Sequence, residues 1–301
     1  MKKTFTLFTF FILVLFYAQN SVDITANWDK GDVFKVNFVS EITDVKNKQT
    51  QTTFSSFVSK FSVDEITDSQ IKTTWVYTEA LLDNKESNLE NIIVSKIINQ
   101  PLKITLSEFG KFVSLDNVAE IRTSVAKIID NELAKTALKS EKALLNVAKN
   151  LIEKDQGLEI LITKNIKAYL FSFGYNYIEN KENTHDLEIP NPFGGANFPA
   201  TETVKMSDLD ENLKTCIVKT SKISEGNALK NTIINVMKQA TNQKNAGEIE
   251  NQLKDLQLEF SESSEHLINY DKGIVNSGFY KRIMNFGVQD RIQLLKFSLQ
   301  K

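Results

Sequence analysis

The sequence predicts an α+β fold in which a long curved antiparallel sheet, made of an N-terminal and a C-terminal meander, packs on a central helical block. Apolar and polar residues alternate from residue 30 to residue 82, which is typical of half-buried strands. Apolar residues recur at helical spacing from residue 117 to residue 173, and alternation returns after residue 200. Strand-type segments at both ends flank a helical middle, so we expect the two halves of the sheet to pair with each other.

The N-terminal part predicts three long strands joined by short polar turns. The first carries Phe34, Val36 and Phe38 on one face, the second lies near residues 54–63, and the third covers residues 71–82. Trp75 and Tyr77 share one face of the third strand, a placement that more often means the core than the lining of a ligand site. Such a succession is typical of an antiparallel meander.

The middle of the chain predicts helices around one hairpin. Residues 88–99 fit a short helix that ends before Pro101, although their β-branched residues favour a strand almost equally. Alternating residues on both sides of Gly110 predict a hairpin. The helical block then covers about residues 117–173, with a first helix to about Lys154 and a second that ends at Gly174, a typical C-terminal cap.

The C-terminal part contains the most distinctive loop. Three of the four prolines and two adjacent glycines lie in residues 189–200, a composition that excludes regular structure there. Phe193 and Phe198 belong to this loop and act either as packing anchors or as an exposed lip, because loops carry function more often than regular elements do. Strands are expected at 201–206, 213–223 and from 256 to 299, with a helix at 224–240.

The first residues predict export. Two of the first three residues, Lys2 and Lys3, are basic. Residues 5–17 then form an uncharged, mostly apolar run with the length of a signal-peptide core. We therefore expect a signal peptide at residues 1–18, a single α+β domain at residues 19–301, and a periplasmic or secreted location. No later stretch is apolar enough to span a membrane as a helix. The single cysteine, Cys216, excludes an internal disulfide and does not fit a lipid anchor.

The sequence lacks the residues that several kinds of chemistry require. The formal net charge of −2 provides no field that would attract nucleic acid. His185 and His266 are the only histidines, and neither lies near a nucleophile motif, so each is expected at the surface or at a strand edge. Two isolated histidines and one cysteine do not make a zinc site, and no phosphate-binding glycine motif occurs. We expect no metal, no cofactor and no enzyme activity, although 38 acidic residues leave a pair of catalytic carboxylates open.

The order of elements resembles that of a known family. The residues that carry it are the signal at 1–18, the opening strand KGDVFKVNFVSEIT and the closing runs YDKGIVNSGFY and RIQLLKFSLQ. Together they resemble the lipoprotein-carrier (LolA-like) half-barrel fold and uncharacterised secreted envelope proteins of the Bacteroidetes. The resemblance implies a curved sheet around helices, with a hydrophobic cleft that could shelter an acyl chain.

Two functional hypotheses follow. In the first, the protein is an exported envelope protein that binds an apolar ligand or lipid between sheet and helices, with contacts from Trp75, Tyr77, Phe193 and Phe198. In the second, it is a structural or interaction protein with a packed core that docks another envelope protein. A continuous cavity would favour the first hypothesis, and a filled core with an exposed patch would favour the second.

Overall fold

A computed structural model describes residues 20–46, 48–83, 89–136, 155–189, 197–224, 259–285 and 289–300. It also describes positions 142, 145, 146, 149, 150, 152, 153 and 230. The expected signal peptide, residues 190–196 of the expected loop and the expected helix at 224–240, apart from positions 224 and 230, lie outside these residues. The expectation of irregular structure over 189–200 is wrong at both ends, because residue 189 and residues 198–200 belong to two paired strands.

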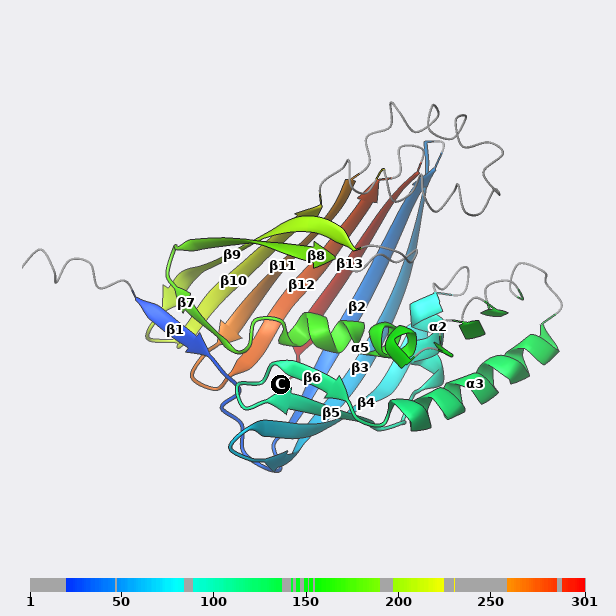
Figure 1. The fold of residues 1–301 in the computed structure, drawn as a ribbon, viewed down its shortest axis with the longest axis horizontal. Coiled ribbons are helices and arrows are strands. Elements are labelled where there is room, and N and C mark those ends of the chain that lie inside the picture. The colour runs from blue at the N-terminus through cyan, green and yellow to red at the C-terminus, as the bar shows by residue number, and fades with distance from the viewer. Residues whose placement is uncertain are drawn as a thin grey trace, which may run out of the picture.

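Most of the described chain forms one antiparallel sheet of eleven strands, with a separate pair, β1 and β7, at one end (Figure 1). Across the large sheet the strand order is β6-β5-β4-β3-β2-β13-β12-β11-β10-β9-β8. The strands are β1 (Ser21–Ile24), β2 (Val33–Lys46), β3 (Gln49–Ile66), β4 (Gln70–Leu82), β5 (Leu102–Ser107), β6 (Phe112–Leu115), β7 (Tyr175–Ile178), β8 (Glu182–Ile189), β9 (Phe198–Asp210), β10 (Thr215–Ser224), β11 (Glu259–Asn269), β12 (Ile274–Asn285) and β13 (Gln289–Leu299).

The two meanders join edge to edge through the antiparallel pairing of β2 with β13. Phe38 lies opposite Phe297 in this seam, and their rings lie 6.2 Å apart. Near the other end of the seam, Arg291 donates to both carboxylate oxygens of Asp44, at 2.7 and 2.8 Å. The prediction that the N-terminal and C-terminal halves of the sheet pair is confirmed.

Among the described residues, the middle of the chain contributes the helices α2 (Leu89–Lys96), α3 (Val118–Lys135) and α5 (Asp155–Leu170), as the sequence predicts. The segment at 88–99, for which a strand was almost as well favoured, is a helix over residues 89–96, followed by a turn at 97–99. The first long helix ends earlier than expected, because Thr136 already has an extended backbone. The apolar stripe continues to about Lys154, but most positions from 137 to 154 lie outside the described residues.

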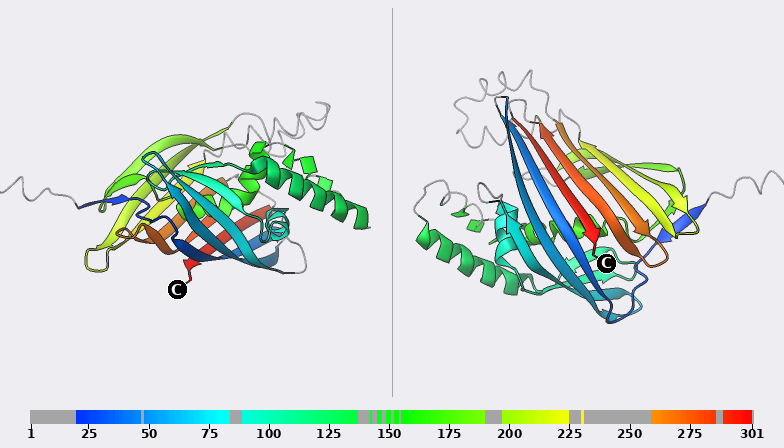
Figure 2. Two further views of the ribbon diagram at one scale, coloured as in Figure 1. Left: turned by 90° about the horizontal axis from the view of Figure 1, so that it is seen from below. Right: turned by 180° about the vertical axis from the view of Figure 1, so that it is seen from behind.

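The sheet is curved around α5. Its two ends, β5–β6 and β8–β9, curl forward on opposite sides of this helix, while β12, β13 and β2 pass behind it (Figures 1 and 2). Helix α5 contacts both β6 and β12, so it lies against the concave face. The expected α+β class with a long curved antiparallel sheet packed on helices is therefore confirmed.

The core between α5 and the sheet is filled by aromatic side chains. Phe61 of β3 and Trp75 of β4 stack with their ring centroids 4.3 Å apart and an angle of 9° between the ring planes. Tyr169 of α5 packs edge-on against both rings and donates a hydrogen bond to the Val275 carbonyl. All three side chains are buried. The three rings therefore pack directly against one another in this part of the interior.

Candidate functional site

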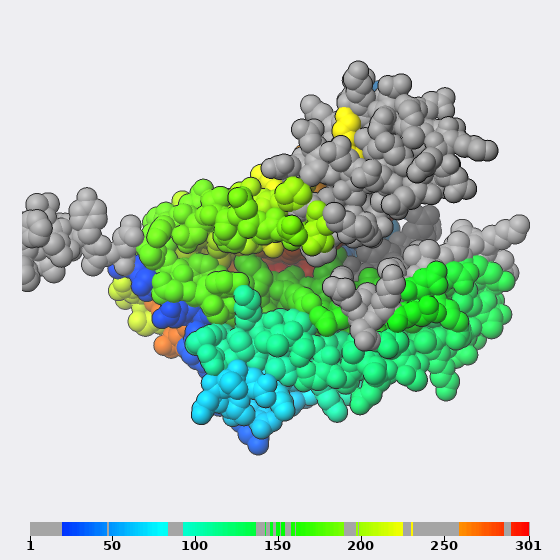
Figure 3. Space-filling view, in the orientation of Figure 1, coloured from blue at the N-terminus to red at the C-terminus, as the bar shows by residue number. Residues whose placement is uncertain are grey.

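A groove lies beside the filled core, between α5 and the concave face of strands β8 to β12. It consists of two adjoining hollows of about 550 and 330 Å³. Lys167 and Phe171 from the helical side and Thr220 and Lys222 from β10 line both hollows, so the two form one continuous groove. In Figure 3, the groove separates the yellow-green strands β8–β9 from the green helix α5. Its size falls in the range typical of small-molecule sites.

The larger hollow, here called the aromatic hollow, is lined by seven apolar or aromatic side chains together with nine polar or charged ones. Its floor and sides are formed by Phe112, Val113, Leu170, Phe171, Tyr175 and Tyr177, and Val204 of β9 completes them. Tyr177 is held in place because its hydroxyl donates to the Ser172 carbonyl at 3.0 Å. Val113 is 58% exposed and Tyr175 46% exposed, so the hollow has an apolar rim open to solvent.

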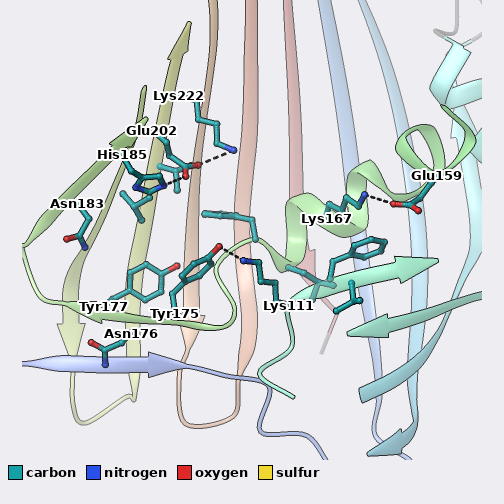
Figure 4. Close-up of a pocket in the computed structure, with 16 residues that line it drawn as sticks. Lys111, Glu159, Lys167, Tyr175, Asn176, Tyr177, Asn183, His185, Glu202 and Lys222 are labelled. Atoms are coloured by element: carbon teal, nitrogen blue, oxygen red, sulfur yellow. Dashed lines mark hydrogen bonds and ion pairs between the residues drawn. The ribbon is translucent and has the colours of Figure 1, made fainter. Parts of the chain in front are cut away.

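Charged side chains border the aromatic hollow and are tied to one another (Figure 4). Glu202 accepts from His185 at 2.7 Å and pairs with Lys222 at 3.0 Å. On α5, Lys167 donates to Glu159 at 2.8 Å and its ammonium lies 4.3 Å from the centre of the Phe112 ring. These contacts hold the long side chains in defined positions around the apolar surface.

The smaller hollow, here called the cationic hollow, has a different lining. Four cationic side chains border it, Lys164, Lys167, Lys222 and Arg282, against one carboxylate, Glu262. Four hydroxyl-bearing residues also line it: Thr220, Ser263, Ser264 and Tyr280. Thr220 and Ser264 are bonded to each other at 2.6 Å.

Glu262 is strongly held. One of its oxygens, Oε1, accepts from Nε and Nη2 of Arg282 at 2.8 and 2.6 Å, and also from the Tyr280 hydroxyl. Burial acts to raise the pKa of Glu262, but Arg282 and the Tyr280 hydrogen bond outweigh it and hold that pKa below its usual range. The carboxylate therefore stays ionised at neutral pH and fixes the Arg282 guanidinium in the wall of the hollow.

Over both hollows, five Lys and Arg side chains face three carboxylates, a formal excess of two positive charges. The whole chain carries a formal net charge of −2, so the groove has the opposite sign to the molecule. All three carboxylates, Glu159, Glu202 and Glu262, are engaged with a basic side chain of the groove. The groove can therefore attract an anion while its apolar end offers a surface for a hydrocarbon.

The structure separates the four residues predicted to contact a ligand. Trp75 and Tyr77 are fully buried in the core, and neither is among the described residues that line the groove. The Tyr77 hydroxyl donates to the Ile162 carbonyl of α5, so it helps to hold the helix on the sheet. Phe198 is the first residue of β9, paired with Ile189 of β8, and Phe193 lies outside the described residues.

The two histidines have different places. His185 lies on the exposed edge strand β8, as expected. His266 is buried in β11, so the expectation of a surface or strand-edge position is wrong for it. His266 follows Glu265, a residue of a type that is usually exposed. Strand alternation places Glu265 on the outer face of the sheet and the His266 imidazole on the inner face. Cys216 is buried in β10, as predicted.

The basic residues of the cationic hollow were missed by sequence reasoning, although a signal for them exists. Lys164 and Lys167 lie three positions apart on one face of a helix whose other residues are mostly apolar. Lys222 follows Thr220 by two positions, and Arg282 follows Tyr280 by two, which places each pair on one face of its strand. Only the packing of α5 on the concave face of the sheet brings these three local patterns together.

The described residues contain no group of three or more His, Cys, Asp or Glu side chains placed to hold a metal ion. None of the helices in the described part of the chain has the length and apolar character needed to cross a membrane.

Comparisons with known proteins give only distant structural similarity. No protein-family model matches the sequence, and no curated protein matches it. A structure of lipovitellin, determined to study lipid–protein interactions, is similar at 10% identity and a TM-score of 0.43 over 91% of this chain. The chain spans 25% of that lipovitellin chain.

Two bacterial structures show weaker similarity. An outer membrane channel from Pseudomonas putida F1 has 7% identity and a TM-score of 0.26, with 92% of this chain and 98% of the channel covered. DynF from the dynemicin biosynthesis pathway of Micromonospora chersina has 7% identity and a TM-score of 0.20, with 94% and 85% covered. None of these similarities assigns the chain to a family.

Proposed function

We propose that this chain is an exported protein of the cell envelope that binds a lipid, or another small molecule with a hydrocarbon part, in the groove between α5 and the sheet. The observation that carries the proposal is the aromatic hollow, a space of about 550 Å³ with seven apolar or aromatic side chains in its lining, which lies beside the packed core. Export is proposed from the N-terminal sequence alone, and the periplasm or the medium is the compartment it implies.

The tight packing of the core supports the view that the groove is a formed binding site and not a packing defect. The core rings stack at short distances, whereas Phe112, Val113 and Tyr175 stay open to solvent at the groove. Burying one methylene group contributes about 0.8 kcal/mol, so about eight methylenes placed on these side chains would contribute roughly 6 kcal/mol before the cost of association. The expected affinity is about micromolar or weaker.

We propose binding rather than catalysis for this groove. A pair of catalytic carboxylates would need one acid whose proton is available near neutral pH. Glu262 is kept ionised by Arg282, and Glu159 and Glu202 each pair with a lysine. Each carboxylate of the groove is thus engaged by a basic side chain, which supports a site that positions charge.

A second candidate function, docking of another envelope protein, is favoured by the outer face of the sheet. Val39 of β2 and Leu267 of β11 are 43% and 38% exposed on the face opposite α5. A shallow hollow that includes Leu267, Phe279 and Leu294 lies on the same face. A binding partner would cover these apolar side chains and leave the groove unchanged.

A fluorescence displacement assay with a matched pair of variants tests the proposal. Val204→Trp fills the aromatic hollow from β9, whereas Val39→Trp places the same bulk on the outer face. We expect N-phenyl-1-naphthylamine to bind the unmodified protein and the Val39→Trp variant, and to lose at least about tenfold in affinity for Val204→Trp. Equal affinity for all three proteins, or no binding by any of them, would contradict the proposal.

A further inference from the structure

The two hollows of the groove differ in chemistry in a way that defines a polarity for the ligand. The aromatic hollow has seven apolar or aromatic residues and three lysines against two glutamates, whereas the cationic hollow has four cations against one glutamate. The excess of positive charge is therefore greater at the cationic hollow. We infer that the ligand is an anionic amphiphile with one hydrocarbon chain, whose carboxylate or phosphate head group binds in the cationic hollow while its chain lies in the aromatic hollow. This inference rests on the proposed function and names the ligand class of that site.

The cations of the head-group end come from three separate elements. Helix α5 supplies Lys164 and Lys167 on one side, while β10 supplies Lys222 and β12 supplies Arg282 on the other. A head group in this hollow would therefore be approached from the helix and from the sheet together. Long-range attraction would add to this, because the groove is positive within a chain of negative net charge.

The cations keep binding capacity in spite of their internal partners. A lysine ammonium carries three donors, and a single carboxylate contact does not use all of them. Lys167 has one such contact with Glu159, and Lys222 has one with Glu202. Their side chains are 39% and 32% exposed, so water now solvates the remaining donors at the groove. A ligand oxygen would replace that water with a charge-assisted hydrogen bond.

The hydroxyls complete the recognition of an oxyanion. Thr220 and Ser264 share one hydrogen bond, so one of the two hydroxyl protons is directed at the other oxygen and the second remains to be directed elsewhere. Both residues line the cationic hollow between Lys222 and the Tyr280 side chain. A carboxylate or phosphate oxygen is the acceptor that such a set of donors fits, whereas a quaternary ammonium group would meet repulsion.

The junction between the hollows sets where the head group ends and the chain begins. Phe171 lines both hollows, and so does Lys167, whose ammonium lies over the Phe112 ring. A chain that leaves the cationic hollow passes Phe171 and continues along Tyr175 and Tyr177. The volume of about 550 Å³ suits one hydrocarbon chain rather than a cluster of lipids.

Displacement of N-phenyl-1-naphthylamine by three ligands with the same chain tests the inference. The ligands are hexadecanoate, hexadecyl phosphate and hexadecanol, tested on the unmodified protein at low and high salt. We expect the better of the two anions to bind about tenfold or more tightly than hexadecanol, and this advantage to shrink at high salt. Whether the carboxylate or the phosphate binds more tightly identifies the head group, and either result supports the inference.

Charge-matched double variants locate the head group. Lys164→Gln/Lys167→Gln removes two cations of the groove, and Lys219→Gln/Lys296→Gln removes two from the outer face of β10 and β13. We expect the first pair to lose about tenfold in affinity for the preferred anion with little change for hexadecanol, and the second pair to bind like the unmodified protein.

The outcomes separate this inference from the function on which it rests. Hexadecanol binding as tightly as both anions, or equal losses for both double variants, would overturn the anionic head group and leave the apolar groove supported. If none of the three ligands displaces the probe, the proposed function itself is wrong.

Discussion

His266 of β11 and Ser172, two residues after α5, form a buried hydrogen bond in which imidazole Nδ1 lies 2.5 Å from the hydroxyl oxygen. Both side chains are fully buried, and the imidazole packs edge-on against Phe171 and Phe297 at 4.1 and 5.0 Å. The pair joins the end of α5 to the middle of the C-terminal meander. It therefore helps to fix Phe171, the residue shared by the two hollows of the groove.

The first prediction concerns the effect of pH on stability. Burial lowers the pKa of His266 to about 3 from 6.5, and the Ala168 carbonyl acts in the opposite direction with a smaller effect. Between these two values the unfolded chain binds a proton that the folded chain excludes, so stability falls as pH decreases from 6.5 toward 3. The slope contributed by His266 is about 1.4 kcal/mol per pH unit.

Urea unfolding at pH 7 and pH 5 measures this slope. We expect the unmodified protein to lose about 2 kcal/mol more than a His266→Gln variant over this interval. His185→Gln, which changes the exposed histidine, should keep the full loss. Identical losses in the unmodified protein and in His266→Gln would mean that the imidazole is not buried in a neutral form.

The second prediction separates the core aromatics from the ligand. Trp75 stacks on Phe61 and is fully buried away from the groove, so Trp75→Phe should lower the free energy of unfolding by about 1–3 kcal/mol. Its affinity for N-phenyl-1-naphthylamine should stay within about twofold of the unmodified protein, a change of roughly 0.4 kcal/mol. A large loss of affinity in a variant that remains folded would mean that Trp75 contacts the ligand.

The third prediction concerns Gly278, whose backbone lies close to its neighbours in the sheet. A Cβ atom at Gly278 of β12 would lie 2.5 Å from the Glu265 carbonyl oxygen and 2.6 Å from the Phe297 ring. Gly278→Ala should therefore destabilise the protein by about 1–3 kcal/mol, since both neighbours are held by pairing and packing. Ser277→Ala, one residue earlier, is the control and should cost much less. Similar unfolding midpoints for the two variants would contradict the packing of Phe297 over Gly278.

The fourth prediction uses the single thiol. Cys216 is buried in β10, and burial raises its pKa to about 12, so the reactive thiolate is scarce at neutral pH. We expect a thiol-specific disulfide reagent to label Cys216 slowly in the native protein and rapidly in urea. Equal rates under both conditions would show that β10 opens easily, which would also weaken the placement of Lys222.

Much of the fold could be predicted from the sequence because it depends on local periodicity. The alternation from Phe34 to Phe38 and the helical spacing around Ile162 and Ile166 report directly on which face is buried. The pairing of the two meanders was also predicted, since two sets of strands at the ends of one chain have exposed edges that can pair. The end of α3 at Lys135 was not predicted, because the apolar stripe continues beyond this residue in the sequence.

The site was less accessible to sequence reasoning. Trp75 and Tyr77 have the residue types of a binding surface, but the same types fill cores, and only packing decides between the two. Lys164, Lys222 and Arg282 could not be brought together from the sequence, because nothing local shows which strands α5 packs against. His266 was misplaced for the same reason, since burial of a polar side chain depends on a partner, Ser172, that lies 94 positions away.

Photo-crosslinking tests the central claim, that the groove between α5 and the sheet holds a hydrocarbon chain with an anionic head group. The unmodified protein would be irradiated with a hexadecanoate that carries a diazirine on its chain, with and without excess hexadecanoate, and the labelled peptides identified by mass spectrometry. We predict labelling at Phe112, Val113, Phe171, Tyr175 or Tyr177, suppressed by the competitor. Competable labelling confined to Leu267, Phe279 and Leu294 on the outer face would contradict the account.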